Sequence, residues 1–308
     1  MSDFKTMSDS GNTSASEASI GEARPDSPVA TRVYPSPNHG ERKGGEKSGR
    51  VTPDSIILHY TGMPSASEAL LWLANPISEV SCHYFVFEDG RVWQMVPEAR
   101  RAWHAGRSSW QGETDMNSRS IGIEIANPGH DLSKAFASEV GTGSREANAS
   151  RERLTIPGPL PPVGPDFPGV QIDAVIALVK DIAARWNIPA ARIVAHSDIA
   201  PGRKIDPGEG FPWEKLAQAG VGLWPDKAIA PLATLPSYRP GDEGLPVAAL
   251  QSMFAKFGYG IEITGVYDQR TADVVTAFQR HWRQGCVDGV ADGETVGVLR
   301  ALMTAAQA

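Results

Sequence analysis

The segment 196–208, HSDIAPGRKIDPG, concentrates ionisable side chains in a stretch whose prolines and glycines disfavour a regular helix. It begins with His196, and Asp206 follows within the same turn-rich stretch. A second histidine, His59, ends the apolar run SIILH, which predicts a β-strand. Two neutral imidazoles and one carboxylate are a normal ligand set for a catalytic zinc, with the fourth position left for water. Two interpretations stay open, because a histidine at a strand end is more often a hydrogen-bonded structural residue than a metal ligand.

The two histidines depend on the strands that carry them. Short runs rich in β-branched and aromatic residues predict strands at 55–60, 120–126 and 192–196. His59 and His196 each end one of these runs, and residues at strand ends point into the loops where binding sites are usually built. We therefore expect both imidazoles to face such loops.

The remaining pattern completes an α/β unit. The runs 83–87 and 91–96 flank an Asp-Gly pair, which predicts a β-hairpin. Apolar residues recur at helical spacing over 171–186, and a shorter helix is expected over 65–74. Strands and helices mixed in this order predict an α/β fold in which helices flank a central mixed β-sheet.

The composition divides the chain, whose 308 residues have room for roughly two domains. Residues 1–33 are rich in Ser, Gly, Asp and Glu, which predicts a disordered leader. The main domain is expected over 34–229, with a long loop at 128–169. A linker rich in proline and glycine follows at 230–243, and three short apolar stripes predict a small C-terminal three-helix domain over 244–308.

Charge and hydropathy limit the partners and the location. The formal net charge of -7 argues against nucleic acid, and no apolar run is long enough for a transmembrane segment. The two cysteines, Cys82 and Cys286, form no disulfide framework. The N-terminal stretch lacks the pattern of a secretory signal, so a cytoplasmic location is expected, with a periplasmic or envelope-associated location as the alternative. The pattern gives no oligomeric state.

Four blocks in order carry a resemblance to a known family. They are SIILHYTGM, SCHYFVFEDGRVWQMVPEARRAWHAGRSSW, NSRSIGIEIANPG and HSDIAPGRKIDPG. From about residue 34 to about residue 220 the chain resembles the zinc-dependent N-acetylmuramoyl-L-alanine amidases of the amidase-2 family, which share their fold with the peptidoglycan recognition proteins. The resemblance implies a Zn²⁺ cofactor held by His59, His196 and Asp206. It also implies that Glu124 and Lys204 are catalytic.

The implied reaction is hydrolysis of the amide that joins N-acetylmuramic acid, or its 1,6-anhydro form, to L-alanine in peptidoglycan or muropeptides. Zinc lowers the pKa of water toward neutrality, Glu124 carries the proton to the leaving amine, and Lys204 helps to stabilise the oxyanion. From the residues alone, an exposed charge on an edge strand is the better interpretation of Glu124. Other residues in the matched blocks are expected near the substrate, each with a structural alternative: His83, Tyr84, Trp103, His104 and Asn117. Asp198 is expected to be a local turn or cap residue.

The C-terminal stretches LQSMFAKFGYGIEITGVYDQRTADVVTAFQRHW and VDGVADGETVGVLRAL resemble a three-helix peptidoglycan-binding domain. Asp268 and Asp292 are expected to cap its second and third helices, each after a glycine turn. The leading function is therefore a cell-wall amidase. The alternatives are a recognition protein of the same fold that binds without cleaving, and an adaptor whose two domains only bind. All five implied metal and catalytic positions are filled, which favours the enzyme.

Overall fold

The computed structural model describes residues 24–45, 49, 51–130, 166–225 and 236–306. Residues 1–23 of the predicted leader, most of the long loop at 128–169 and the first part of the predicted linker lie outside the described residues. None of the described helices combines the length and the apolar run that a membrane span needs.

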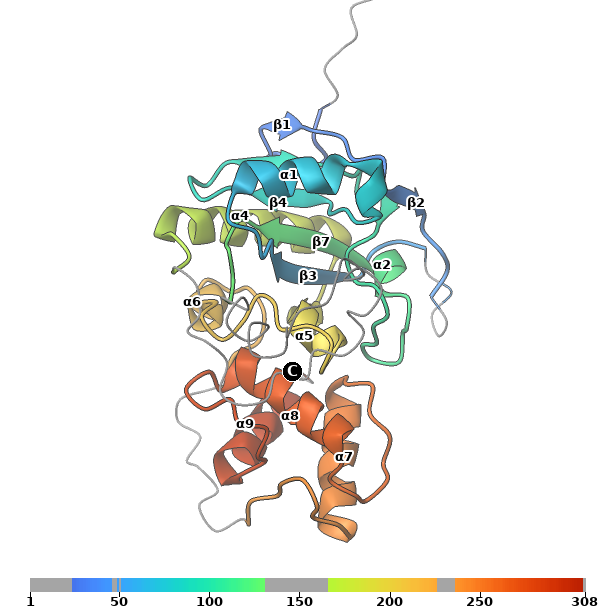
Figure 1. The fold of residues 1–308 in the computed structure, drawn as a ribbon, viewed down its shortest axis with the longest axis vertical. Helices are drawn as coiled ribbons and strands as arrows, with labels where there is room; N and C mark the ends of the chain where they lie inside the picture. Colours follow the sequence, from blue (N-terminus) through green and yellow to red (C-terminus); the bar gives the residue numbers. More distant parts are fainter. Residues whose placement is uncertain (1–23, 46–48, 50, 131–165, 226–235, 307–308) are drawn as a thin grey trace, which may run out of the picture.

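Six strands form one mixed sheet in the order β1-β5-β4-β7-β3-β8 (Figure 1). β4 and β5 pair antiparallel, and the other neighbouring strands pair in parallel. The predicted α/β fold with a central mixed sheet is therefore confirmed. The strands are β1 (Arg32–Val33), β3 (Ser55–Tyr60), β4 (Tyr84–Val86), β5 (Val92–Gln94), β7 (Ser120–Ile125) and β8 (Ile193–Ala195). Two more strands, β2 (His39–Glu41) and β6 (Arg100–Ala102), pair antiparallel in a separate small sheet.

Helices cover both faces of the central sheet. The helix α4 (Gly169–Trp186) packs its apolar stripe on one face, against alternate residues of β3 and β7 such as Leu58 and Ile123. On the other face, α1 (Ala66–Ala74) packs near Phe85 of β4. Ser65 caps α1, because its side chain accepts the backbone N–H of Glu68. The shorter helices are η1 (Pro76–Ser78), α2 (Met116–Arg119), η2 (Ala190–Arg192), α5 (His196–Ile199) and α6 (Trp213–Gln218).

The C-terminal domain consists of α7 (Leu245–Phe257), α8 (Gln269–Trp282) and α9 (Gly293–Ala305). The side chains of Asp268 and Asp292 accept the backbone N–H groups of Thr271 and Thr295, each at 2.9 Å. Both predicted caps are confirmed. The preceding turn residue Gly265 has φ +74, a region that favours glycine.

The two parts of the chain share one apolar core. Ile57 of β3 and Trp110 belong to the same cluster as Phe254 and Phe278 of the C-terminal helices. Trp110 is fully buried there, and its ring packs edge-on against that of Tyr259. In Figure 1 the C-terminal helices accordingly lie against the α5 side of the sheet. The C-terminal domain is thus docked on the main domain through a buried apolar surface.

Two boundaries differ from the sequence prediction. β1 lies before residue 34, inside the range predicted as leader, and pairs with β5; Asp26 also hydrogen-bonds Gln94. The apolar content of this stretch is low, so composition alone could not reveal strand pairing supplied by a distant segment. His196 begins the helix α5 instead of ending a strand, because Asp198 accepts the backbone N–H of Ala195 and turns the chain into one helical turn.

Candidate metal centre and active site

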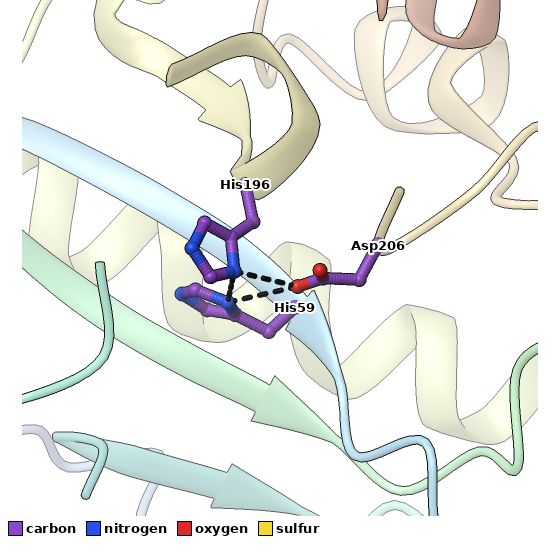
Figure 2. Close-up of side chains that lie close together, drawn as sticks. All are labelled: His59, His196 and Asp206. Carbon is purple, nitrogen blue, oxygen red and sulfur yellow. Dashed lines mark hydrogen bonds and ion pairs between the residues drawn. The ribbon is translucent and has the colours of Figure 1, made fainter. Parts of the chain in front are cut away.

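The sheet brings the predicted chemical groups to one edge. β3 runs parallel to β7 with His59 opposite Glu124, and parallel to β8 with Leu58 opposite Ala195. His196 directly follows Ala195, so the carboxyl ends of these parallel strands place both imidazoles side by side. Parallel sheets commonly bind ligands at this edge. The loop after α5 then returns Asp206 to the same place (Figure 2).

His59, His196 and Asp206 form a compact buried cluster, the metal centre (Figure 2). Asp206 Oδ2 lies 3.0 Å from the Nδ1 atom of each histidine, and the two Nδ1 atoms are 2.9 Å apart. Ligand atoms about 2.0–2.1 Å from a tetrahedral zinc are roughly 3.3 Å from one another. The three atoms therefore need only a small outward shift to hold such an ion.

Hydrogen bonds fix which nitrogen of His196 carries the proton. Its Nε2 lies 3.1 Å from the carbonyl oxygen of Ala105, which can only accept a hydrogen bond. Nε2 therefore carries the hydrogen, and Nδ1 of the neutral ring presents a lone pair to Asp206. Burial lowers the pKa of His196 to about 3, so the ring is neutral.

A longer chain of hydrogen bonds shows which ring nitrogen of His59 carries the proton. The hydroxyl of Ser120 donates to the carbonyl oxygen of Met116 at 2.5 Å, so its oxygen accepts from His104 Nε2 at 3.2 Å. His104 Nδ1 is then unprotonated and accepts from His59 Nε2 at 3.0 Å. His59 Nδ1 therefore also presents a lone pair to Asp206.

Three acceptor atoms thus converge with no proton to place between them. Asp206 is buried as well, and its carboxylate oxygen Oδ2 is the third acceptor atom. Two lone pairs and a carboxylate oxygen about 3 Å apart repel one another in a buried site unless a cation lies among them. The geometry and the protonation of the metal centre both fit a bound divalent metal ion.

Glu124 lies beside the metal centre on β7. The residue is half-buried, and its Oε2 atom is buried without a hydrogen-bond partner among the described residues. Burial raises the pKa of Glu124 to about 7, against the opposing effect of the cationic Lys204. A carboxylate with this pKa can accept and return a proton near neutral pH.

Lys204 lies in the loop between two members of the metal centre, and its backbone N–H is held by the carbonyl oxygen of Ala200 at 3.1 Å. Its charge acts on both Glu124 and His196, since it lowers the pKa of each. In the part of the chain that the structure describes, no hydrogen bond or ion pair holds its side chain. The ammonium is therefore available to a group that develops negative charge near the metal centre.

His104 and Asn117 support the site from behind. Both ring nitrogens of His104 bond within the protein, to His59 and Ser120. Asn117 Oδ1 accepts the backbone N–H groups of His104 and Ala105 at 2.9 and 2.8 Å. A Cβ atom at Gly122 would overlap the His104 ring, so only glycine leaves room for this arrangement. These contacts give both residues the structural role that the sequence left open as the alternative, and their contact with substrate stays a prediction.

Tyr84 differs from the expectation of substrate contact, and His83 has partners within the protein. Both nitrogens of the buried His83 bond within the protein, to Gly122 N and to the carbonyl oxygen of Arg100. Tyr84 points to the opposite face of the sheet, where its hydroxyl donates to Glu98 at 2.6 Å. Successive strand residues alternate between faces, so this adjacent pair could not both reach the site. Trp103 is half-buried, and its contact with substrate stays a prediction.

Sequence reasoning missed Ser120 and assigned Asp198 only a local role. Ser120 is the first residue of the predicted strand 120–126 and carries no distinguishing signal in the sequence, because its role depends on the ring of His104. Asp198 does cap α5, but its carboxylate also bonds Tyr259 and His281 of the C-terminal domain. Spacing in the sequence could not indicate contacts across so long a separation.

Comparison with known families assigns most of the described chain. Residues 49–209 match the family described as N-acetylmuramoyl-L-alanine amidase, and this range contains every member of the metal centre. Residues 243–299 match a peptidoglycan binding domain.

Individual relatives cover most of the chain. N-acetylmuramoyl-L-alanine amidase AmiD of Escherichia coli is 36% identical over 260 residues, which is 80% of this chain and 81% of AmiD. The 1,6-anhydro-N-acetylmuramyl-L-alanine amidase AmpD of Enterobacter cloacae is 29% identical over 205 residues, 61% of this chain and 89% of AmpD.

Solved structures agree with this assignment. The E. coli AmiD complex with anhydro-N-acetylmuramic acid-L-Ala-D-gamma-Glu-L-Lys has a TM-score of 0.67 at 34% identity, covering 86% of this chain and 93% of AmiD. AmpDh3 of Pseudomonas aeruginosa has a TM-score of 0.65 at 30% identity, covering 85% of this chain and 95% of its own. The chain therefore belongs to the amidase-2 family of N-acetylmuramoyl-L-alanine amidases and carries a C-terminal peptidoglycan-binding domain.

Proposed function

We propose that the protein is a zinc hydrolase that cleaves the amide between N-acetylmuramic acid, or its 1,6-anhydro form, and L-alanine. The observation that supports a bound metal ion is the convergence of two imidazole lone pairs and the Asp206 carboxylate, with no proton among them. A set of two nitrogen ligands and one oxygen ligand suits zinc and leaves a fourth position open.

Bound zinc would lower the pKa of a water molecule toward neutrality and polarise the scissile carbonyl group. The protein supplies the proton transfers and the remaining charge. Glu124 Oε2 accepts the proton of the attacking water and returns it to the nitrogen of the leaving L-alanine. The ammonium of Lys204 stabilises the negative charge that develops on the carbonyl oxygen, in a site largely closed to solvent.

The substrate class rests on the relatives and on the second domain. AmiD was solved with an anhydro-muropeptide, and AmpDh3 with an anhydromuramic pentapeptide. The C-terminal peptidoglycan-binding domain favours a substrate that belongs to, or comes from, the wall polymer. Both muropeptides and peptidoglycan are therefore proposed as substrates, and the preferred one would indicate recycling or wall turnover.

The alternative is a recognition protein that binds wall fragments without cleaving them. Loss of a metal ligand or of the proton-accepting carboxylate would favour it, yet His59, His196, Asp206 and Glu124 are all in place. Zinc content of the purified protein, with mass spectrometry of products from an anhydro-muropeptide and from intact peptidoglycan, separates the two functions. One zinc per chain with released peptide supports the hydrolase. Wall binding with neither zinc nor cleavage would establish the alternative.

A further inference from the structure

A buried carboxylate joins the metal centre to the C-terminal domain. Asp198 lies in α5, in the same helical turn as the predicted ligand His196, and is fully buried. Its Oδ1 accepts the hydroxyl of Tyr259 at 2.8 Å. Its Oδ2 lies 2.6 Å from His281 Nδ1 and also accepts the backbone N–H of Ala195 at 2.8 Å. A buried carboxylate needs such partners, because unpaired charge is costly in the interior.

Both side-chain partners of Asp198 come from the C-terminal domain. Tyr259 follows the C-cap residue of α7, and His281 lies in the last turn of α8. The imidazole of His281 is stacked between the indoles of Trp213 and Trp282, with ring centroids 3.7 and 3.6 Å away. This packing leaves His281 no freedom to follow a moving α5, so it fixes the place of the Asp198 carboxylate.

The helix α8 also holds the loop that follows α5. Arg270 Nη1 donates to the carbonyl oxygen of Pro201 at 2.9 Å, at the start of the loop. Further along, Arg280 forms an ion pair with Glu209, with Nε and Oε2 3.5 Å apart. Gln284, just after α8, donates to the carbonyl oxygen of Phe211 at 2.7 Å. α8 therefore contacts both ends of the loop that carries Lys204 and Asp206.

The metal centre is sensitive to this loop because Asp206 must meet both histidines at once. Asp206 Oδ2 lies 3.0 Å from each Nδ1 atom, and its backbone carbonyl oxygen accepts the N–H of Ser197 in α5 at 3.0 Å. A shift of α5 against β3 would move His196 and Asp206 away from His59. Within the main domain, the pairing of β8 with β3 places Ala195 beside Leu58 and so anchors the start of α5, while the Asp198 carboxylate further along the turn bonds Tyr259 and His281.

We propose that the C-terminal domain is a positioning part of the metal centre, with Tyr259 and His281 acting through Asp198 on His196. The domain thus does more than tether the enzyme to the wall. This inference rests on the zinc centre of the proposed function. The competing interpretation is that the C-terminal domain is only a docked binding module. Its loss would then change attachment to the wall and leave metal binding unchanged.

The test compares full-length variants. Tyr259→Phe keeps the ring and removes one hydrogen bond, and the double variant Y259F/H281F keeps both aromatic rings and removes both bonds to Asp198. His281→Asn is the conservative variant, because its side-chain NH₂ group can take the place of the Nδ1–H donor. Arg283→Gln is the matched control, since it breaks contacts of Arg283 with Asp292 and Glu294 inside the C-terminal domain only.

Two readouts report on the metal centre itself. The first is the rate at which each zinc-loaded protein loses zinc to a chelator, and the second is the visible absorption spectrum of the cobalt-substituted protein. We expect Y259F/H281F to lose zinc about tenfold faster than the parent, as removal of groups that orient metal ligands does. Its cobalt spectrum should change as well. The rate of zinc loss from Tyr259→Phe should lie between those of the parent and Y259F/H281F, and His281→Asn should lose zinc more slowly than Y259F/H281F. Arg283→Gln should match the parent in both readouts, even if its Tm falls.

Parental zinc loss and an unchanged cobalt spectrum in Y259F/H281F would overturn the proposal. If the double variant does not fold, the same comparison with Tyr259→Phe decides, because one hydroxyl is then the only change. A parent protein that binds no zinc would refute the proposed function instead, so the two failures are distinguishable.

Discussion

Replacement of Ser120 by alanine tests how the protein fixes the tautomer of a metal ligand. The hydroxyl of Ser120 accepts from His104 Nε2 at 3.2 Å, and His104 Nδ1 in turn accepts from His59 Nε2. Without the hydroxyl, the buried N–H of His104 has lost its acceptor. The ring can relieve this by moving its proton to Nδ1, which then faces the proton on His59 Nε2.

The expected loss of zinc affinity follows from these two possible tautomers. A buried donor left without an acceptor costs about 1–3 kcal/mol. If the His59 ring changes its tautomer instead, its proton moves from Nε2 to Nδ1. There it occupies the lone pair that would bind the metal. The variant then spends about this energy before it binds zinc, so its zinc affinity should fall roughly 5- to 150-fold, since about 1.4 kcal/mol corresponds to a factor of ten.

Chelator competition with a fluorescent zinc indicator measures this affinity. Ser55→Ala is the matched control, because Ser55 is fully buried, lies opposite Ser120 in the register of β3 and β7, and bonds Asp54 instead of a metal ligand. It should lose about 0.5–1.5 kcal/mol of stability and keep the parental zinc affinity. Equal zinc affinity in Ser120→Ala and Ser55→Ala would refute the tautomer argument.

Four further results are expected. Glu124→Gln should retain zinc and lower kcat by about 10²–10⁴-fold, as a lost general base does, and a variant that turns over normally would exclude this role. Since Glu124 must be ionised to accept a proton and burial raises its pKa to about 7, parental activity should fall as the pH drops through this region, a limb that Glu124→Gln should lack. Tyr84→Phe should reduce stability by about 1–2 kcal/mol through its lost bond to Glu98 and leave kcat/KM unchanged, so a raised KM would return Tyr84 to the substrate site. Gly122→Ala should weaken zinc binding because its Cβ displaces His104, and parental affinity would contradict that packing.

The metal centre could be predicted from the sequence because its members come from segments with strong local signals. His59 ends an apolar strand, and His196 and Asp206 belong to one turn-rich segment. The parallel pairing that brings them together follows once the fold class is known.

The supporting residues could not be predicted, because their roles depend on side chains distant in the sequence. Asn117 holds the backbone of His104, and Asp198 bonds residues of another domain. Tyr84 is the instructive exception. Its neighbour His83 belongs to the same predicted run, 83–87, and the alternation of faces along such a run already excluded a common direction for the two side chains.

Removal and return of the metal tests the central claim most directly. Protein stripped of metal by a chelator and then supplied with one equivalent of zinc is incubated with an anhydro-muropeptide, and the products are identified by mass spectrometry. The proposed function predicts no cleavage by the stripped protein and, after zinc is returned, release of a peptide with a free amino group on L-alanine. Equal cleavage without metal, or cleavage at another bond, would contradict it.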